Sequence, residues 1–263
     1  MESIILRRKI SIQEDFLTAA LADILTDFDD ISLLRNILKS CGSIGSGGQI
    51  NLHRQLPIAD GVSYEIELWP YWGNIGEPDM VIWLKNGNNK EIAGVVVEVK
   101  YEASKSGEDT EEEPKLRDQL GRYAQGLDNL LSTEADRIVI YLTATSFPPL
   151  EELARSWKAI SQKTTLDPSR VLGWISWRDI DRIFSDFRRQ LIPDSIHIRR
   201  IDRVRELLAR AGLQLFEGWN SEGAPKSPNH QIPKTLQWLE YRSWTGWKTV
   251  LAPPRPRGLI IEN

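Results

Sequence analysis

Several residue types are scarce in this chain, and their scarcity excludes several classes of protein. The 263 residues include a single cysteine, Cys41, which excludes an internal disulfide framework and fits a reducing cytoplasm. With only three histidines besides, a structural zinc site is not expected. No apolar run approaches the length of a membrane-spanning helix, and the N-terminus lacks the charged-then-apolar order of a secretory signal. We therefore expect a cytoplasmic protein without a membrane partner.

Positive charge is also limited, which bears on the kind of partner the chain can have. The formal net charge is −4, so the chain is not of the strongly basic type that coats nucleic acid. The balance is uneven, because residues 1–192 carry an excess of acidic side chains and residues 193–263 an excess of basic ones. An acidic core with a modestly basic extension is still able to hold a phosphate backbone.

Hydrophobic periodicity indicates alternating helices and strands over the first four fifths of the chain. Their order predicts an α/β fold in which helices flank a mixed central sheet. The glycine-rich residues 41–48 are expected to form a flexible connector. They lack the Gly-Lys-Ser/Thr of a nucleotide-binding loop, so we do not expect such a loop here. Helices are predicted over residues 11–28, 32–40, 114–131, 150–160, 177–191 and 201–211, and strands over residues 49–57, 62–69, 80–84, 95–99, 138–142 and 171–176.

We divide the chain into a core, residues 1–192, and an extension, residues 193–263. The end of this extension has little periodicity and is rich in proline and tryptophan, with Trp219, Trp238, Trp244 and Trp247. Tryptophans at this density usually fill a core or an interface, although aromatic and basic residues together also suit nucleic-acid binding. We expect an irregular extension that packs on the core.

Three chemically active side chains are expected to meet at the end of the predicted strands. Asp79 opens one apolar run, and Glu98 and Lys100 end the next, two residues apart and therefore on one face of a strand. Two carboxylates and a lysine at one sheet edge suit a hard divalent cation and a phosphate. The alternatives are a turn residue after proline for Asp79, a solvent-facing strand end for Glu98, and a simple salt bridge between Glu98 and Lys100.

Two flanking helices add further candidates. Gln119 and Tyr123 are four residues apart and share a helix face, which also suits a helix that simply packs on the sheet. Glu14 lies three residues after Ser11, the spacing of a capping box at a helix start. A glutamate engaged in such a cap is not free to bind a metal, so these two roles compete.

These motifs resemble those of the PD-(D/E)XK nuclease superfamily. Glu77-Pro78-Asp79, a spacer and Glu98-Val99-Lys100 follow the order of the superfamily motif. Gln119-x-x-x-Tyr123 resembles the motif of its RecB-type branch. The resemblance covers roughly residues 11–145 and implies a restriction-endonuclease-like sheet. The segment Glu14-Asp15-Phe16-Leu17-Thr18 is similar to the opening helix of bacterial members linked to restriction or phage defence.

The resemblance also implies a role for each candidate. Asp79, Glu98 and the carbonyl of Val99 would hold Mg²⁺ or Mn²⁺, with Glu14 as a further ligand. Lys100 would contact the phosphate or the attacking water, as a cation or as a base. Gln119 and Tyr123 would orient the substrate backbone or the lysine.

The expected function is therefore a Mg²⁺-dependent deoxyribonuclease that hydrolyses DNA phosphodiester bonds in phage defence or restriction. A homo-oligomer or a partner subunit is compatible with this expectation. The alternatives are a catalytically weak nuclease-fold module that binds nucleic acid or a partner, and a ribonuclease. The acidic residues 108–113, which follow Lys100, are expected to form a solvated loop, the alternative being a flap that covers the site.

Overall fold

The computed structural model describes residues 2–28, 31–45, 50–51, 61–101, 118–193 and 195–214. All of them belong to one compact unit that ends at Phe216, so the predicted boundary after residue 192 falls inside this unit. The acidic residues 108–113 and the four tryptophans of the predicted extension lie outside the described residues.

The centre of the described unit is a seven-stranded mixed sheet with the order β2-β1-β7-β6-β5-β4-β3. Strands β5, β6 and β7 run parallel to one another. Strand β4 pairs antiparallel with β3 and with β5, and β1 pairs antiparallel with β7 and with β2. This confirms the prediction of an α/β fold with a mixed sheet. The strands are β1 (Gly42–Ile44), β2 (Ile50–Asn51), β3 (Ser63–Leu68), β4 (Met80–Lys85), β5 (Glu91–Lys100), β6 (Asp136–Thr143) and β7 (Leu172–Ser176).

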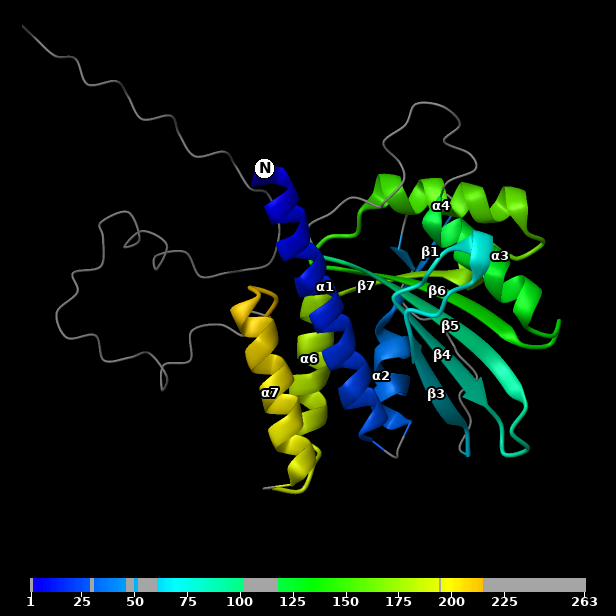
Figure 1. Ribbon diagram of the computed structural model, residues 1–263. Helices are drawn as coiled ribbons and strands as arrows, with labels where there is room; N and C mark the ends of the chain where they lie inside the picture. Colours follow the sequence, from blue (N-terminus) through cyan, green and yellow to red (C-terminus); the bar gives the residue numbers. More distant parts are fainter. Residues whose placement is uncertain are drawn as a thin grey trace, which may run out of the picture. The chain divides into compact units, whose positions relative to one another are not determined.

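Helices cover both faces of this sheet, as Figure 1 shows. One layer contains α1 (Glu2–Thr26), α2 (Ser32–Ser40), α6 (Trp177–Arg188) and α7 (Ile196–Arg210). The other contains α3 (Gln119–Leu130), α4 (Leu150–Lys163) and α5 (Pro168–Val171). Because side chains alternate along a strand, Val97 and Val99 of β5 face the first layer, whereas Val96 faces the second. The almost wholly apolar sequences of β4 and β5 follow from this burial on two sides.

The first helix differs from the prediction at its start. It begins at Glu2, and Ser11 lies in the middle of it, so the predicted capping box of Ser11 and Glu14 is wrong. Residues 2–10 contain no glycine or proline, and nothing in them stops a helix that has begun further along the chain. The apolar stripe that the sequence indicated, including Leu17, Leu21 and Leu25, is buried as predicted.

Two other boundaries also need correction. The predicted flexible connector begins with a strand, β1, because Ile44 is buried between β1 and the second helical layer. The helix predicted from Pro114 begins instead at Gln119, because Asp118 is extended and its carboxylate accepts a hydrogen bond from the amide of Gly121. Residues 102–117 lie outside the described part of the chain.

Most of the remaining elements agree with their predictions. Helix α2 has the predicted bounds, and β3 to β7, α4, α6 and α7 differ from theirs mainly in length. Of the strand predicted over residues 49–57, the structure describes β2, and residues 52–60 lie outside the description. In the parts of the chain that are described, no helix has the length and apolar character needed to cross a membrane.

Candidate active site

The candidate residues gather at the end of the sheet where β5 terminates. Met80 of β4 pairs with Val97 of β5. Asp79, the residue just before β4, therefore lies beside the last residues of β5. Asp79 lies two residues before Val81, and Glu98 lies two residues after Val96. Residues two apart on a strand share a face, so both carboxylates lie on the α3 side of the sheet. The antiparallel pairing of β4 and β5 thus brings together two carboxylates that are far apart in the sequence.

Asp79 is tied directly to the backbone of β5. Its Oδ2 accepts a hydrogen bond of 2.7 Å from the amide of Val99, while its own carbonyl accepts one of 3.2 Å from Trp69. Lys100 faces the other neighbour, because its carbonyl accepts a hydrogen bond from Ala144 beyond β6. Since the backbone groups of successive residues point to opposite sides of a strand, the Val99 carbonyl points toward β4 and Asp79. The side chain of Asp79 therefore does more than complete a turn.

Glu98 is the most deeply buried of the candidate carboxylates. It is 1% exposed, so the alternative of a solvent-facing strand end is wrong. Lys100 Nζ lies 2.7 Å from its Oε1, yet neither carboxylate oxygen receives a hydrogen bond of good geometry from the described residues. A buried carboxylate normally has its oxygens satisfied by several donors, so Glu98 is under-coordinated.

The pKa shifts of the cluster agree with this shortage of positive charge and hydrogen-bond donors. Burial, and then the charge of Asp79, raise the pKa of Glu98 to about 8. Burial also raises the pKa of Asp79 and of Glu14, against the opposing effect of Lys100 in each case. For Lys100, burial lowers the pKa but the charges of Glu98 and Asp79 outweigh it, and the net shift is upward. Among the described residues, the carboxyl groups of Glu14, Asp79 and Glu98 therefore share the Lys100 cation, and the cluster is suited to receive more positive charge.

Glu14 reaches this cluster from the opposite helical layer. Its Oε1 accepts a hydrogen bond of 2.6 Å from the amide of Tyr101, the residue that follows β5. Its carboxylate also interacts electrostatically with Lys100 and Asp79. The long helix α1 and the end of β5 position it, and no sequence signal identified the Tyr101 amide as its partner.

Gln119 and Tyr123 lie behind the carboxylates and are almost fully buried. Gln119 Nε2 donates a hydrogen bond of 2.9 Å to Tyr123 Oη, which donates one of 3.0 Å to the carbonyl of Glu77. Burial, followed by the charge of Glu98, raises the pKa of Tyr123. This pair holds the segment that leads into Asp79, and it acts on the site through that segment.

The donor set fits a magnesium or manganese ion. Mg²⁺ takes oxygen ligands, usually one or two carboxylates together with water, and Asp79, Glu98 and the Val99 carbonyl are such donors. The under-coordinated oxygens of Glu98 are the observation that favours this fit. Within the described residues no group of three or more Asp, Glu, His or Cys side chains is already arranged around a common metal position. A bound ion would therefore complete its shell with the carbonyl and water.

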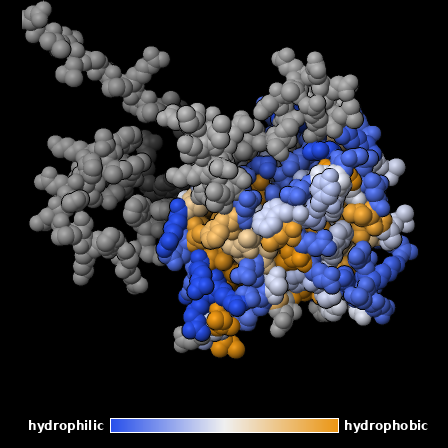
Figure 2. Space-filling model, in the orientation of Figure 1, coloured by the Kyte–Doolittle hydropathy of each residue, from blue (hydrophilic) through white to orange (hydrophobic). Residues whose placement is uncertain are grey.

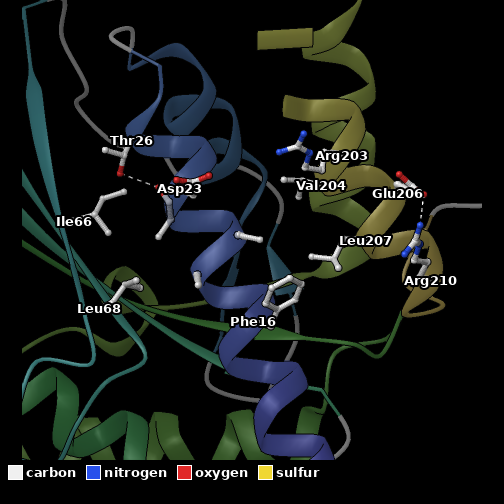
Figure 3. Close-up of a pocket in the computed structure, with 13 residues that line it drawn as sticks. Phe16, Asp23, Thr26, Ile66, Leu68, Arg203, Val204, Glu206, Leu207 and Arg210 are labelled. Carbon is white, nitrogen blue, oxygen red and sulfur yellow. Dashed lines mark hydrogen bonds and ion pairs between the residues drawn. The ribbon is translucent and has the colours of Figure 1, made fainter. Parts of the chain in front are cut away.

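A large cavity lies elsewhere in the described unit, and none of the candidate residues lines it. It is an open groove of about 790 Å³ between α1, α7 and β3. Figure 3 shows Phe16 and Asp23 of α1 on one side of it and Val204 and Leu207 of α7 on another. Figure 2 shows hydrophobic atoms gathered in this region beside α1 and α7. Its lining is largely apolar, and Asp23 and Glu206 are the acidic residues in it.

Comparison of the chain with protein-family models, with curated proteins and with solved structures finds no match in any of the three.

Proposed function

We propose that this protein is a metal-dependent nuclease that hydrolyses DNA phosphodiester bonds, with a restriction-endonuclease-like fold. The observation that carries the proposal is the buried, under-coordinated carboxylate of Glu98 beside Asp79 and Lys100, at the end of β5. A structural ion pair would satisfy its carboxylate, whereas a site for a divalent ion leaves oxygens open. The resemblance to RecB-type nucleases motivates the choice of a phosphodiester substrate, and DNA is the partner we propose.

Each residue has a distinct role in this proposal. Asp79, Glu98 and the Val99 carbonyl would hold Mg²⁺ or Mn²⁺. Glu14 would contact this ion through one of the ion's water ligands. The ion supplies Lewis-acid stabilisation of the phosphate and a water of lowered pKa. Lys100 carries its positive charge next to the carboxylates, so we assign it to the charge that develops on the phosphate oxygens.

The same resemblance motivates the proposed biological setting. Related opening helices occur in bacterial proteins of restriction and phage defence, and we propose that this chain acts there, in the cytoplasm. A partner subunit or a second copy is compatible with such a role. Hydrolysis of one strand requires only the residues already described.

The test is a cleavage assay on supercoiled circular and linear DNA in Mg²⁺. We expect Glu98→Gln and Asp79→Asn each to lower the cleavage rate by about 10³-fold, since metal stabilisation of the transition state contributes several kcal/mol. The matched control is Glu91→Gln, a glutamate at the exposed start of the same strand, which should cleave like the wild type. Cutting of the circular form identifies an endonuclease.

The outcomes separate this proposal from its rivals. Equal cleavage by Glu98→Gln and by the wild type would overturn the assigned site. Absence of cleavage, together with calorimetric Mg²⁺ binding that does not depend on Glu98, would leave only a nucleic-acid-binding or assembly module. Faster cleavage of RNA than of DNA in a parallel assay would reassign the substrate.

A further inference from the structure

Exposed aromatic side chains surround the end of the sheet where the candidate active site lies. Tyr71 is 78% exposed, Phe147 is 70% exposed and Trp69 is 36% exposed. Tyr71 and Trp69 belong to the loop between β3 and β4, and Phe147 to the loop between β6 and α4. These loops flank β5 on its two sides at the end that carries Lys100. Water-exposed aromatic residues in fixed positions beside a polar site commonly contact a ligand.

The loop between β3 and β4 presents Tyr71 on a fixed support. At its start the amide of Trp69 donates to the carbonyl of Asp79, and at its end the carbonyl of Glu77 accepts from Tyr123. Between them Trp72 turns inward and packs at 6.4 Å, edge to face, on Tyr123. Tyr71, next to this anchored residue, remains exposed.

Backbone conformation adds a second observation about this loop. Trp69 has a φ of 50°, in the left-handed region that large aromatic residues rarely adopt. Such conformations persist where the surrounding structure imposes them, and they are concentrated at binding sites. Here the amide of Trp69 donates to the carbonyl of Asp79, so this unusual conformation lies next to a proposed metal ligand.

The loop that carries Phe147 is also ordered by specific contacts. Thr145 donates to the carbonyl of Phe147 at 2.9 Å, and its hydroxyl lies 3.0 Å from that of Thr143. Thr143 is the register partner of Lys100 on the neighbouring strand. The ends of β3 and β6 are three strand spacings apart, about 15 Å, with the carboxylates between them.

We infer that Tyr71 and Phe147, assisted by Trp69, stack on the bases of a single-stranded DNA segment whose phosphate lies at Asp79, Glu98 and Lys100. This inference rests on the proposed nuclease function and names its substrate class. In a duplex the bases stack on one another, so an aromatic side chain reaches a base face only where the strand is unpaired or frayed. Stacking on aromatic side chains also adds affinity to the phosphate contacts of a chain whose net charge is −4.

The test is fluorescence anisotropy with a labelled oligothymidylate of about twenty nucleotides, in Ca²⁺ and with intact DNA verified on a gel. Loss of one stacked base is worth a factor of about 5 to 150, so Tyr71→Ala and Phe147→Ala should each raise the Kd by that range. Tyr71→Phe keeps the ring and should bind like the wild type. Ile192→Ala, an equally exposed residue beyond the far end of α6, is the control and should have no effect.

An abasic oligonucleotide of the same length and charge distinguishes stacking from phosphate binding. On this probe the wild type and Tyr71→Ala should bind equally, and a blunt duplex should bind more weakly than oligothymidylate. The inference is overturned if Tyr71→Ala and Phe147→Ala bind oligothymidylate like the wild type, or if their losses persist on the abasic strand. Cleavage that depends on Glu98 and not on Glu91 would in that case still support the nuclease, so the two failures are distinguishable.

Discussion

Two buried carboxylates in this protein have opposite surroundings. Asp181 of α6 is 0% exposed and meets the guanidinium of Arg205 in α7, with Nε at 2.8 Å and Nη2 at 3.4 Å. Among the described residues, Glu98 of β5 is 1% exposed and forms an ion pair with Lys100, while a second carboxylate, Asp79, lies in contact with it. Two N–H groups of the Arg205 guanidinium satisfy Asp181, whereas Glu98 lies next to a second carboxylate.

The difference separates a structural acid from a functional one. The ion pair of Asp181 and Arg205 lies between two packed helices, and two guanidinium N–H groups hydrogen-bond to the buried carboxylate. Glu98 is held in place by the pairing of β5 on both sides, although its charge is unfavourable there without an additional cation. The sheet therefore holds an electrostatically unfavourable carboxylate at the position of the proposed active site.

The largest effect on stability should come from removing Asp181, the buried acid that is fully hydrogen-bonded to Arg205. Asp181→Ala leaves the Arg205 guanidinium without its main partner, and we expect the free energy of unfolding to fall by about 3 to 5 kcal/mol. Glu98→Gln, measured in EDTA, should change it by less than about 1 kcal/mol or raise it, because a like-charge repulsion is removed. Urea denaturation followed by circular dichroism measures both.

Asp186→Ala is the matched control for the first variant. Asp186 lies on the same helix and forms an ion pair with Arg189, but both side chains are exposed. Its loss should cost no more than about 1 kcal/mol. A fall for Glu98→Gln as large as that for Asp181→Ala would mean that both acids are structural, and the comparison would fail.

A second prediction concerns the pH dependence of stability in the metal-free protein. The pKa of Glu98 is about 8 in the folded state and near 4.5 when unfolded, so the folded state binds the proton more tightly. The contribution of this group is fully present below about pH 4.5 and is lost as the pH rises to about 8. Its slope should reach about 1.4 kcal/mol per pH unit, and the raised pKa values of Asp79 and Glu14 act in the same direction.

Unfolding in EDTA at a series of pH values measures this slope. Glu98→Gln should flatten the curve between about pH 5 and 8, while Glu91→Gln should keep it. Added Mg²⁺ should stabilise the wild type more as the pH rises, because the metal competes with the proton for the carboxylates. A curve that Glu98→Gln leaves unchanged would show that another group carries the dependence.

The sequence contained the information for the strands and for the meeting of Asp79, Glu98 and Lys100. Continuous apolar runs predict strands buried on both faces, and alternation fixes which side chains share a face. The partners of these groups could not be predicted, because the Val99 and Tyr101 amides are backbone donors with no residue signature. The start of α1 and the strand β1 were missed since tertiary packing determined them and local composition did not.

The smallest effect should come from the support behind the site. Tyr123→Phe removes the hydroxyl that joins Gln119 to the carbonyl of Glu77 and keeps the ring that packs on Trp72. Loss of this partly buried hydrogen bond should cost about 1 kcal/mol of unfolding free energy. Because the loosened segment leads directly into Asp79, we expect DNA cleavage to fall as well, by about 10-fold, with little change in binding of oligothymidylate.

Tyr141→Phe tests whether that loss of cleavage is specific. Tyr141 is also almost fully buried, and its hydroxyl donates a hydrogen bond of 2.8 Å to Glu152 of α4, away from the segment before Asp79. The two variants should lose similar stability, since each removes one hydroxyl from a buried ring. Only Tyr123→Phe should slow cleavage, because only its hydroxyl holds the backbone next to a proposed metal ligand. Equal cleavage by the two variants would assign Tyr123 to the core, and the positioning of Asp79 would then depend on its hydrogen bonds with the Val99 and Trp69 amides.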